Sequence, residues 1–241
     1  MKMSKPLLPN GVFWHLAATP ADLARKLAEQ IALILRQRLD AAPRASLALS
    51  GGSTPILLFK ALAQQELDWQ RIDIVQVDER WVEPSHPDSN SAQIRQHLLQ
   101  GRAAVARFHP LYVNAPSPAA GLGAVCQRLE SVSWPLDLVV LGMGNDGHTA
   151  SLFPDAPELV DAMAENNGSK LAAITPPHQA RARITLTRSA IAGARDCILH
   201  IQGDDKLATL TQALAEPDNW AQMPIRAFLR SGLHIFWSAA K

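Results

Sequence analysis

The residues with the clearest chemical potential in this sequence are an aspartate and a histidine, Asp146 and His148, in the glycine-rich stretch LGMGNDGHTAS (141–151). The unperturbed pKa of histidine, about 6.5, lets its side chain take up a proton near neutral pH. A neighbouring carboxylate can orient the imidazole ring and stabilise its protonated form. Glycines allow unusual backbone dihedrals, so this loop can project both side chains into a cleft. The pattern predicts a general base, His148, assisted by Asp146; the alternative is a histidine that only caps a turn.

The same loop carries the glycine spacing of a dinucleotide-binding fingerprint, G-x-G-x-x-G, in Gly142, Gly144 and Gly147. That fingerprint needs a helix directly after the loop, and then a second strand that ends in an acidic residue about 20 residues further on. Glu165 lies at about that distance, but the segment before it is polar, contains two prolines and has no strand pattern. The sequence therefore disfavours nucleotide binding.

A second candidate site is the turn SGGST at 50–54, which lies between a strand pattern and a helix pattern. Free backbone N–H groups at the start of a helix bind phosphate well. The hydroxyl groups of Ser53 and Thr54 can add donors, although the G-K-[ST] ending of a Walker loop is missing. Gly51, Gly52, Ser53 and Thr54 are therefore candidate phosphate ligands. The alternative is an ordinary tight turn with a helix cap.

Charged residues follow the apolar stretch IDIVQVD at 72–78, which is typical of a buried strand. Asp78, Glu79 and Arg80 stand at its end or directly after it. Ligands of open α/β sheets bind beyond the carboxyl ends of the strands. Asp78 and Arg80 are therefore candidates for substrate contacts, with an internal Asp–Arg pair as the alternative.

Two further basic residues stand where an anion would stabilise them. Arg183 opens the strand-like stretch RITLT, and Lys206 lies in the first turn of the helix predicted after HIQG. The dipole of a helix disfavours a cation in the first turn, so a lysine there suggests a bound anion. An exposed lysine without a ligand is the alternative. Most of the other histidines are predicted to be structural or solvent-facing: His86, His97, His109, His178, His200 and His234.

Apolar patterns of two kinds alternate along the chain, and they mark the elements that must position these residues. Thr19 and Pro20 suit the cap and the first position of a helix, and apolar residues recur after them at helical spacing. The strand-like stretches are apolar on nearly every residue, as expected of strands buried on both faces. The expected strands are 45–49, 72–78, 136–141, 170–175, 183–187, 197–203 and 233–238, and the expected helices are 20–39, 55–65, 89–99, 117–130 and 204–215.

This alternation predicts an α/β fold with a doubly wound, mainly parallel sheet flanked by helices, which is Rossmann-like. No repeat of fixed period, low-complexity linker or clear domain boundary appears, so residues 1–241 are expected to form a single domain. The segment 154–168 is polar and irregular, and we expect it to be a surface flap.

Composition narrows the class of protein further. The 241 residues are 47% apolar and carry a net charge of +1, so the chain can bury a core and has no basic tract for nucleic acid or an anionic membrane. The start lacks the apolar stretch of a signal peptide, and no run is long enough to span a bilayer. Cys126 and Cys197 are expected to be reduced thiols. No His or Cys spacing suggests a metal site. We therefore expect a cytoplasmic protein without nucleic-acid or membrane partners.

Four motifs in this order resemble one family. LSGGSTP, VDERWV…HPDSN, LGMGNDGHTASLFP and PPHQARARITLT together are similar to the 6-phosphogluconolactonases, which are related to the glucosamine-6-phosphate isomerases/deaminases. The resemblance spans nearly the whole chain and is most specific at 141–154. It implies a single α/β domain that hydrolyses 6-phospho-D-glucono-1,5-lactone to 6-phosphogluconate, in the oxidative pentose phosphate pathway. It also implies no cofactor or metal, and a monomer or weak homodimer.

The resemblance implies where the phosphate of this small-molecule substrate binds. The turn Gly51-Gly52-Ser53-Thr54 would lie at the phosphate, and Arg183 and Lys206 would pair with it.

For the reacting end of the substrate, the resemblance implies that His148 is the base that activates water. Asp146 would position His148 or the sugar. Arg80 would contact the substrate beside Asp78, and either Arg80 or backbone N–H groups of the glycine-rich loop would stabilise the oxyanion.

Two other functions are weighed against this one. The isomerase/deaminase relatives carry a glutamate before the proline that closes the glycine-rich motif, where this sequence has Phe153, which cannot relay a proton. A non-catalytic sugar-phosphate sensor could keep the phosphate ligands but would not need His148, and no DNA-binding motif appears.

Overall fold

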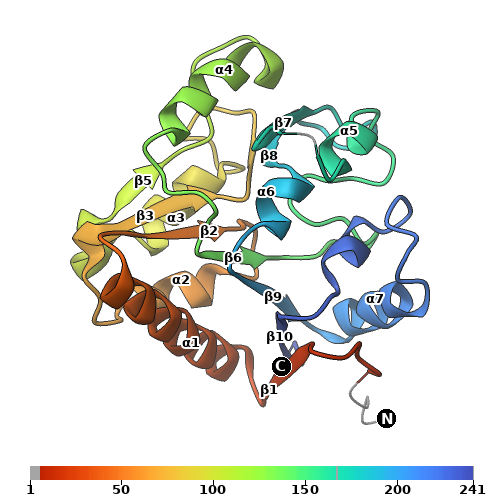
Figure 1. Ribbon diagram of the computed structural model, residues 1–241, viewed down its shortest axis with the longest axis horizontal. Coiled ribbons are helices and arrows are strands. Elements are labelled where there is room, and N and C mark those ends of the chain that lie inside the picture. The colour runs from red at the N-terminus through yellow and green to blue at the C-terminus, as the bar shows by residue number, and fades with distance from the viewer. Residues whose placement is uncertain (1–5, 167, 241) are drawn as a thin grey trace.

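The computed structural model describes residues 6–166 and 168–240. Its centre is a seven-stranded sheet in which all neighbouring strands are parallel, in the order β1-β10-β9-β6-β2-β3-β5 (Figure 1). The predicted α/β fold with a mainly parallel sheet is confirmed. The strands of this sheet are β1 (Phe13–Ala17), β2 (Ala45–Leu49), β3 (Ile72–Gln76), β5 (Arg107–His109), β6 (Leu138–Leu141), β9 (Asp196–Gln202) and β10 (Leu233–Ser238).

Helices cover both faces of this sheet, so it is doubly wound. Alternate residues of a strand point to opposite faces, and the strand residues accordingly divide between two hydrophobic clusters. Leu49 and Val140 pack with α1 and α2, whereas Val139 and Leu141 pack with α4, α6 and α7. The helices are α1 (Pro20–Ala41), α2 (Ile56–Ala63), α3 (Asn90–His97), α4 (Pro118–Leu129), α5 (Leu159–Met163), α6 (Arg188–Ala192) and α7 (Asp204–Ala215), with 3-10 turns η1 (Trp69–Arg71), η2 (Gly101–Val105) and η3 (Pro224–Phe228).

Local capping explains where the predicted helices begin. At the start of α1, the hydroxyl of Thr19 accepts a hydrogen bond from the backbone N–H of Asp22 at 3.1 Å, and Pro20 occupies the first turn. Ser89 caps α3 in the same way. The edge strands β1 and β5 were not predicted. An edge strand is not covered on both sides, so its sequence lacks the continuous apolar run of a central strand.

A second, smaller sheet was also not predicted. It is antiparallel and has the order β4-β8-β7, with β4 (Asp78–Arg80), β8 (Arg183–Leu186) and β7 (Leu171–Ile174). The stretch 72–78 is therefore not one strand: it is divided after Gln76, and Asp78 begins a strand of the other sheet. Hydrophobic pattern alone does not distinguish these two cases, because Val77 is fully buried between the two strands.

The prediction of a surface flap at 154–168 is wrong for the middle of the segment, although most of its described residues are exposed or partly exposed. Its middle forms α5, whose Leu159, Ala162 and Met163 are buried in one of the two hydrophobic clusters. Val160 and Asp161, which lie between them, are exposed, and the polar residues on either side of the helix made the segment look irregular in sequence. Residue 167 of this segment lies outside the described residues.

The connections leave the sheet in opposite directions from β2 and β6. From β2 the chain continues to β3 and β5 on one side, and from β6 it continues to β9 and β10 on the other. Such a reversal opens a crevice at the carboxyl ends of the two strands, where α/β proteins bind ligands. Cys126 and Cys197 are both free thiols. Within residues 6–166 and 168–240, no helix has the length and apolarity needed to span a bilayer.

Candidate active site

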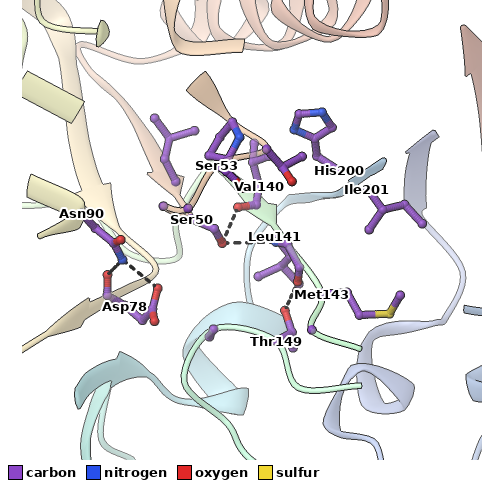
Figure 2. Close-up of a pocket in the computed structure, with 18 of the residues that line it drawn as sticks. Ser50, Ser53, Asp78, Asn90, Val140, Leu141, Met143, Thr149, His200 and Ile201 are labelled. Atoms are coloured by element: carbon purple, nitrogen blue, oxygen red, sulfur yellow. Dashed lines mark hydrogen bonds between the residues drawn. The ribbon is translucent and has the colours of Figure 1, made fainter. Parts of the chain in front are cut away.

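A pocket of about 250 Å³ lies at this reversal point, between the loops that follow β2 and β6. The two loops are tied together, because the backbone N–H and the hydroxyl of Ser50 both donate to the carbonyl of Val140 at 3.1 Å. The N–H of Gly142 in turn donates to the Ser50 hydroxyl at 3.3 Å (Figure 2). The pocket therefore has a hydrogen-bonded base at the centre of the main sheet.

Most of the predicted site residues line this pocket. Asp146 does not line it, but it contacts a residue that does, and Arg183 lies one strand away. The predicted residues that line the pocket are Gly51, Gly52, Ser53, Thr54, Asp78, Arg80, His148 and Lys206.

Asp146 and His148 form a hydrogen-bonded pair at the pocket wall. Nδ1 of the His148 ring lies 2.5 Å from Oδ1 of Asp146, and the backbone N–H of His148 donates to the same oxygen at 3.1 Å. Burial of Asp146 opposes its ionisation, but the hydrogen bonds and the charge interaction with His148 outweigh burial, so the pKa of Asp146 lies below its usual value. The ionised carboxylate can only accept, so Nδ1 of His148 donates to it, and in the neutral form of the ring Nε2 has the free lone pair.

Two glycines shape the loop that presents this pair. A Cβ atom on Gly144 would lie 2.2 Å from the His148 ring, so only glycine leaves room for the imidazole. Gly147 has φ +78°, in the left-handed region that favours glycine, and a Cβ atom there would lie 2.7 Å from Met223. Gly144 and Gly147 thus allow the loop to hold the Asp146–His148 pair. Residues 142–158, all described, contain no helix, whereas a dinucleotide fingerprint is followed directly by one.

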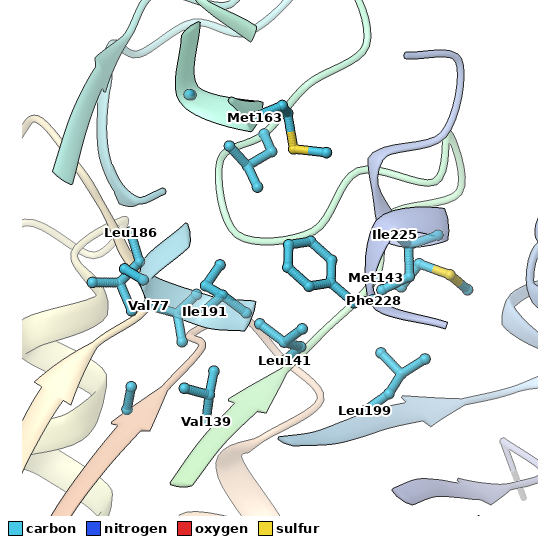
Figure 3. Packing of buried hydrophobic residues seen from close by; sticks show 14 of the residues in the cluster. Val77, Val139, Leu141, Met143, Met163, Leu186, Ile191, Leu199, Ile225 and Phe228 are labelled. Atoms are coloured by element: carbon cyan, nitrogen blue, oxygen red, sulfur yellow. The ribbon is translucent and has the colours of Figure 1, made fainter. Parts of the chain in front are cut away.

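The outer part of this loop is braced from the C-terminal side of the chain. The N–H of Ile225 in η3 donates to the carbonyl of Gly147 at 2.9 Å. Figure 3 shows Ile225 and Phe228 packed with Met143 above Leu141 and Leu199 of the main sheet. The loop that holds His148 therefore rests on a close-packed apolar base, which limits its movement.

The turn at 50–54, the candidate phosphate site, has a backbone conformation that requires its glycines. Gly52 has φ +110°, and a Cβ atom on Gly51 would lie 2.0 Å from Oδ1 of Asn90, so neither position tolerates a side chain. The N–H of Gly52 already donates to Oε1 of Gln93 at 2.9 Å. No side chain caps the following helix, α2. The donors that the turn can offer are therefore the hydroxyl groups and the first N–H groups of α2.

A buried carboxylate, Glu79, organises the segment that carries Asp78 and Arg80. Its side chain is fully buried and connects β4 with the start of α3. Five donors reach its two oxygens at 2.7–3.1 Å, namely the backbone N–H groups of Arg80, Asn90 and Ser91 and the side chains of Gln76 and Ser89.

Asp78 and Arg80 are held separately by this arrangement. The carboxylate of Asp78 accepts hydrogen bonds from the Ser151 hydroxyl at 2.5 Å and from Nδ2 of Asn90 at 3.3 Å. The guanidinium of Arg80 donates to the carbonyl of Asp88 at 2.9 Å. Among the described residues, Asp78 and Arg80 form no ion pair with each other, which removes the alternative of an internal pair.

The two remaining cations lie on different sides of the site. Lys206, in the first turn of α7, lines the pocket and donates to Oδ1 of Asn145. Arg183 is buried on β8, directly opposite Arg80 of β4, and its guanidinium donates to the carbonyl of Arg181 at 3.0 Å. Burial lowers the pKa of Arg183, while the neighbouring charge of Asp78 raises it. Directly opposite residues of an antiparallel pair project from the same face, so Arg183 lies beside Arg80, although it does not line the pocket itself.

Five polar residues of the pocket wall were not among the predicted site residues: Ser50, Asn90, Thr149, His200 and Gln202. His200 and Gln202 lie at the carboxyl end of β9. His200 was assigned to a structural or solvent-facing class, but it lines the pocket and its residue surface is only 4% exposed. Its place at the end of a predicted strand was a usable signal, since the same rule selected Asp78.

Comparison with known proteins agrees with this fold. The model of the family described as glucosamine-6-phosphate isomerases/6-phosphogluconolactonase matches residues 18–237. A 6-phosphogluconolactonase of Pseudomonas aeruginosa is 44% identical over 237 residues, which cover 98% of this chain and 99% of that protein. The crystal structure of a 6-phosphogluconolactonase from Shewanella baltica has a TM-score of 0.92 at 40% identity, and covers 97% of this chain and 100% of that one.

The fold and the pocket thus define an α/β protein with an Asp–His pair opposite a phosphate-type turn. The chain belongs to the glucosamine-6-phosphate isomerase/6-phosphogluconolactonase family. The family predicted from the four motifs is confirmed.

Proposed function

We propose that this protein is a 6-phosphogluconolactonase, which hydrolyses 6-phospho-D-glucono-1,5-lactone to 6-phosphogluconate in the oxidative pentose phosphate pathway. The observation that carries the proposal is the Asp146–His148 pair on the wall of a pocket that also contains the turn at 51–54 and Lys206. The high identity to relatives with this name over nearly the whole chain supports it.

The phosphate end of the substrate would be anchored first. Lys206 and the donors of the turn at 51–54 bind the phosphate oxygens by charge-assisted hydrogen bonds. The charge of Arg183, which lies opposite Arg80 on the neighbouring strand, adds attraction for the phosphate. Anchoring this end places the lactone carbon, C1, near His148.

Hydrolysis then needs one base and one oxyanion site. Nε2 of His148 takes a proton from water, and the hydroxide attacks C1 while Asp146 stabilises the imidazolium. The oxyanion forms near Arg80 or the backbone N–H groups of the glycine-rich loop. The C1–ring oxygen bond then breaks, and the ring oxygen receives the proton from His148. Water supplies both added groups, the hydroxyl on C1 and the hydrogen on the ring oxygen, so the chemistry balances without a further reactant.

Phe153 favours hydrolysis over the isomerase/deaminase reaction of the same family. Its ring packs against the ring of His148 with centroids 4.4 Å apart. A hydrocarbon ring at this place excludes water on that side and cannot exchange a proton with the histidine. The geometry therefore gives His148 one hydrogen-bonding partner, Asp146, and leaves the other ring nitrogen for water.

The direct test compares two substrates. Freshly generated 6-phosphogluconolactone should be hydrolysed far above its spontaneous rate, and glucosamine 6-phosphate should release no ammonia. Ammonia release at a comparable rate would reject the lactonase in favour of a deaminase. Binding of the lactone without turnover would favour a sugar-phosphate sensor. We expect the enzyme to act in the cytoplasm as a single domain, as a monomer or weak homodimer, without nucleic-acid partners.

A further inference from the structure

The carboxyl end of β9 places two polar side chains on the same face of the main sheet. His200 and Gln202 are two residues apart, so their side chains point to the same side of the strand. Ile198, two residues earlier, packs in the cluster formed with α1 and α2, so this is the face that α2 covers. Figure 2 shows the His200 ring on the opposite side of the sheet from Thr149. Both side chains line the pocket.

Both side chains carry a buried nitrogen that has no partner. Among the described residues, neither Nε2 of His200 nor Nε2 of Gln202 has a hydrogen-bond partner. A buried polar group without a partner costs about 1–3 kcal/mol, and most buried polar groups in native proteins are paired. Both residues line the same pocket, so a single acceptor-rich group bound there could satisfy both nitrogens.

The charge state of His200 decides what kind of ligand it suits. Burial alone lowers the pKa of His200 to about 4, so the ring is neutral near pH 7 and carries one N–H. The amide nitrogen of Gln202 is also a neutral donor. The adjoining wall is largely apolar, with Leu49, Leu58 and Val140. The sub-pocket therefore offers neutral donors in surroundings of low dielectric, and the positive charge comes from Lys206.

The two ends of the pocket lie on different faces of the sheet. The loop with His148 leads into Leu152 and Phe153, which pack in the cluster on the far face from α1 and α2. The turn at 51–54 leads into α2 itself, on the face that His200 shares. Donors on that face lie at the phosphate end of the substrate, away from the reacting carbon.

We propose that His200 and Gln202 are specificity-determining donors that bind oxygen atoms of the substrate's phosphate group, beside Lys206 and the turn at 51–54. The inference rests on the proposed function for the identity of the substrate. It adds His200 and Gln202 to the residues that bind the phosphate. His200 then recognises the substrate and takes no part in the chemical step.

Replacement of His200 by phenylalanine tests this role, because the variant H200F keeps the ring shape and removes the N–H. We expect KM for 6-phosphogluconolactone and the inhibition constant of inorganic phosphate to rise about tenfold, the equivalent of one neutral hydrogen bond of about 1.4 kcal/mol. The kcat value should stay within about twofold. H200Q, which replaces the ring N–H by an amide N–H, should recover part of the lost phosphate affinity. H178F, at an exposed histidine, is the control.

Glucono-1,5-lactone, which has no phosphate, separates recognition from structural damage. Its kcat/KM should be the same for wild type and H200F. An equal loss on both lactones would overturn the inference, since it would show that His200 supports the fold or the chemistry. Unchanged KM and unchanged phosphate inhibition in H200F would overturn it as well.

A measurement on the wild-type protein does not depend on turnover. Titration with inorganic phosphate should shift the ring nitrogen resonances of His200 in NMR spectra, and raise its pKa as the anion binds. Resonances that stay fixed at saturating phosphate would reject the inference. A protein that binds phosphate at His200 but does not hydrolyse the lactone would instead reject the proposed function, so the two failures are distinguishable.

Discussion

Two histidines of one pocket differ in every property that decides their chemistry. His148 lies on the loop after β6, its side chain is 27% exposed, and its ring is paired with Asp146. His200 lies within β9, its residue surface is 4% exposed, and the Nε2 atom of its ring has no partner among the described residues. The same type of side chain is therefore prepared for two different tasks.

The environment explains this division of roles. A carboxylate partner and access to solvent favour a ring that can accept a proton, as His148 requires. Burial without a charged partner penalises protonation and keeps His200 a neutral donor. The comparison teaches that the backbone position around a histidine, more than the histidine itself, decides whether it acts as a base or as a ligand.

Replacement of His148 by alanine should have the largest effect. Loss of a general base lowers the rate by about 10²–10⁴-fold, so kcat for the lactone should fall by that factor while circular dichroism and the melting temperature stay near wild type. H178A, on an exposed histidine, is the matched control. A near-normal kcat in H148A would remove the distinction between the two histidines.

The pH dependence of stability should reveal the buried histidine. The folded-state pKa of His200, about 4, lies below its unfolded value of about 6.5, so protonation favours the unfolded chain. The contribution of neutral His200 to the unfolding free energy is complete above pH 6.5 and is lost as pH falls towards 4. The loss is about 2 kcal/mol at pH 5 and about 3 kcal/mol below pH 4.

Urea denaturation of wild type and H200F at several pH values measures this contribution. As pH falls from 7 to 5, the unfolding free energy of wild type should fall more than that of H200F, which has no imidazole to protonate at this position. If the plots of unfolding free energy against pH for the two proteins stay parallel over this range, His200 is not buried in its neutral form.

Replacement of Asp146 by asparagine should give a smaller loss of rate than loss of His148. The variant keeps the shape of the side chain but removes the charge that stabilises imidazolium. A charged hydrogen bond is worth about 1.5–3 kcal/mol, so kcat should fall about 10- to 150-fold. D155N is a matched control, because Asp155 lies 3.5 Å from His178 in a second Asp–His pair at the surface. Equal kcat in wild type and D146N would leave His148 without a functional partner.

Replacement of Lys206 by methionine should have the smallest effect, and should appear in KM. The variant keeps the aliphatic part of the side chain and loses one charge at the phosphate end, which costs about 1.5 kcal/mol, or about tenfold in KM. The kcat value should change little, unlike that of H148A. K60M, on the exposed side of α2, is the control. A loss confined to kcat would place Lys206 at the reacting end.

The central part of the fold could be predicted from the sequence, because central strands carry their own signal. The stretches that became β2, β6, β9 and β10 are apolar on most positions, and the caps at Thr19 and Ser89 mark the starts of α1 and α3. The stretches that became β7 and β8 were also predicted as strands, but their pairing with β4 in a second sheet was not predicted, and neither was α5. β4 and α5 are short, and the sheet joins residues that are distant in the sequence, as Asp78 on β4 pairs with Thr185 on β8.

The sequence by itself determined the composition of the candidate site. Residue types and their positions after strands indicated the Asp–His pair, the glycine turn and Lys206, and the motifs indicated the family. Only the tertiary structure decided which of these residues share a wall, that Arg183 lies opposite Arg80, and that Nε2 of the buried His200 has no partner among the described residues. The physical reason is that residue chemistry is local, whereas burial and pairing depend on which strands and helices pack together.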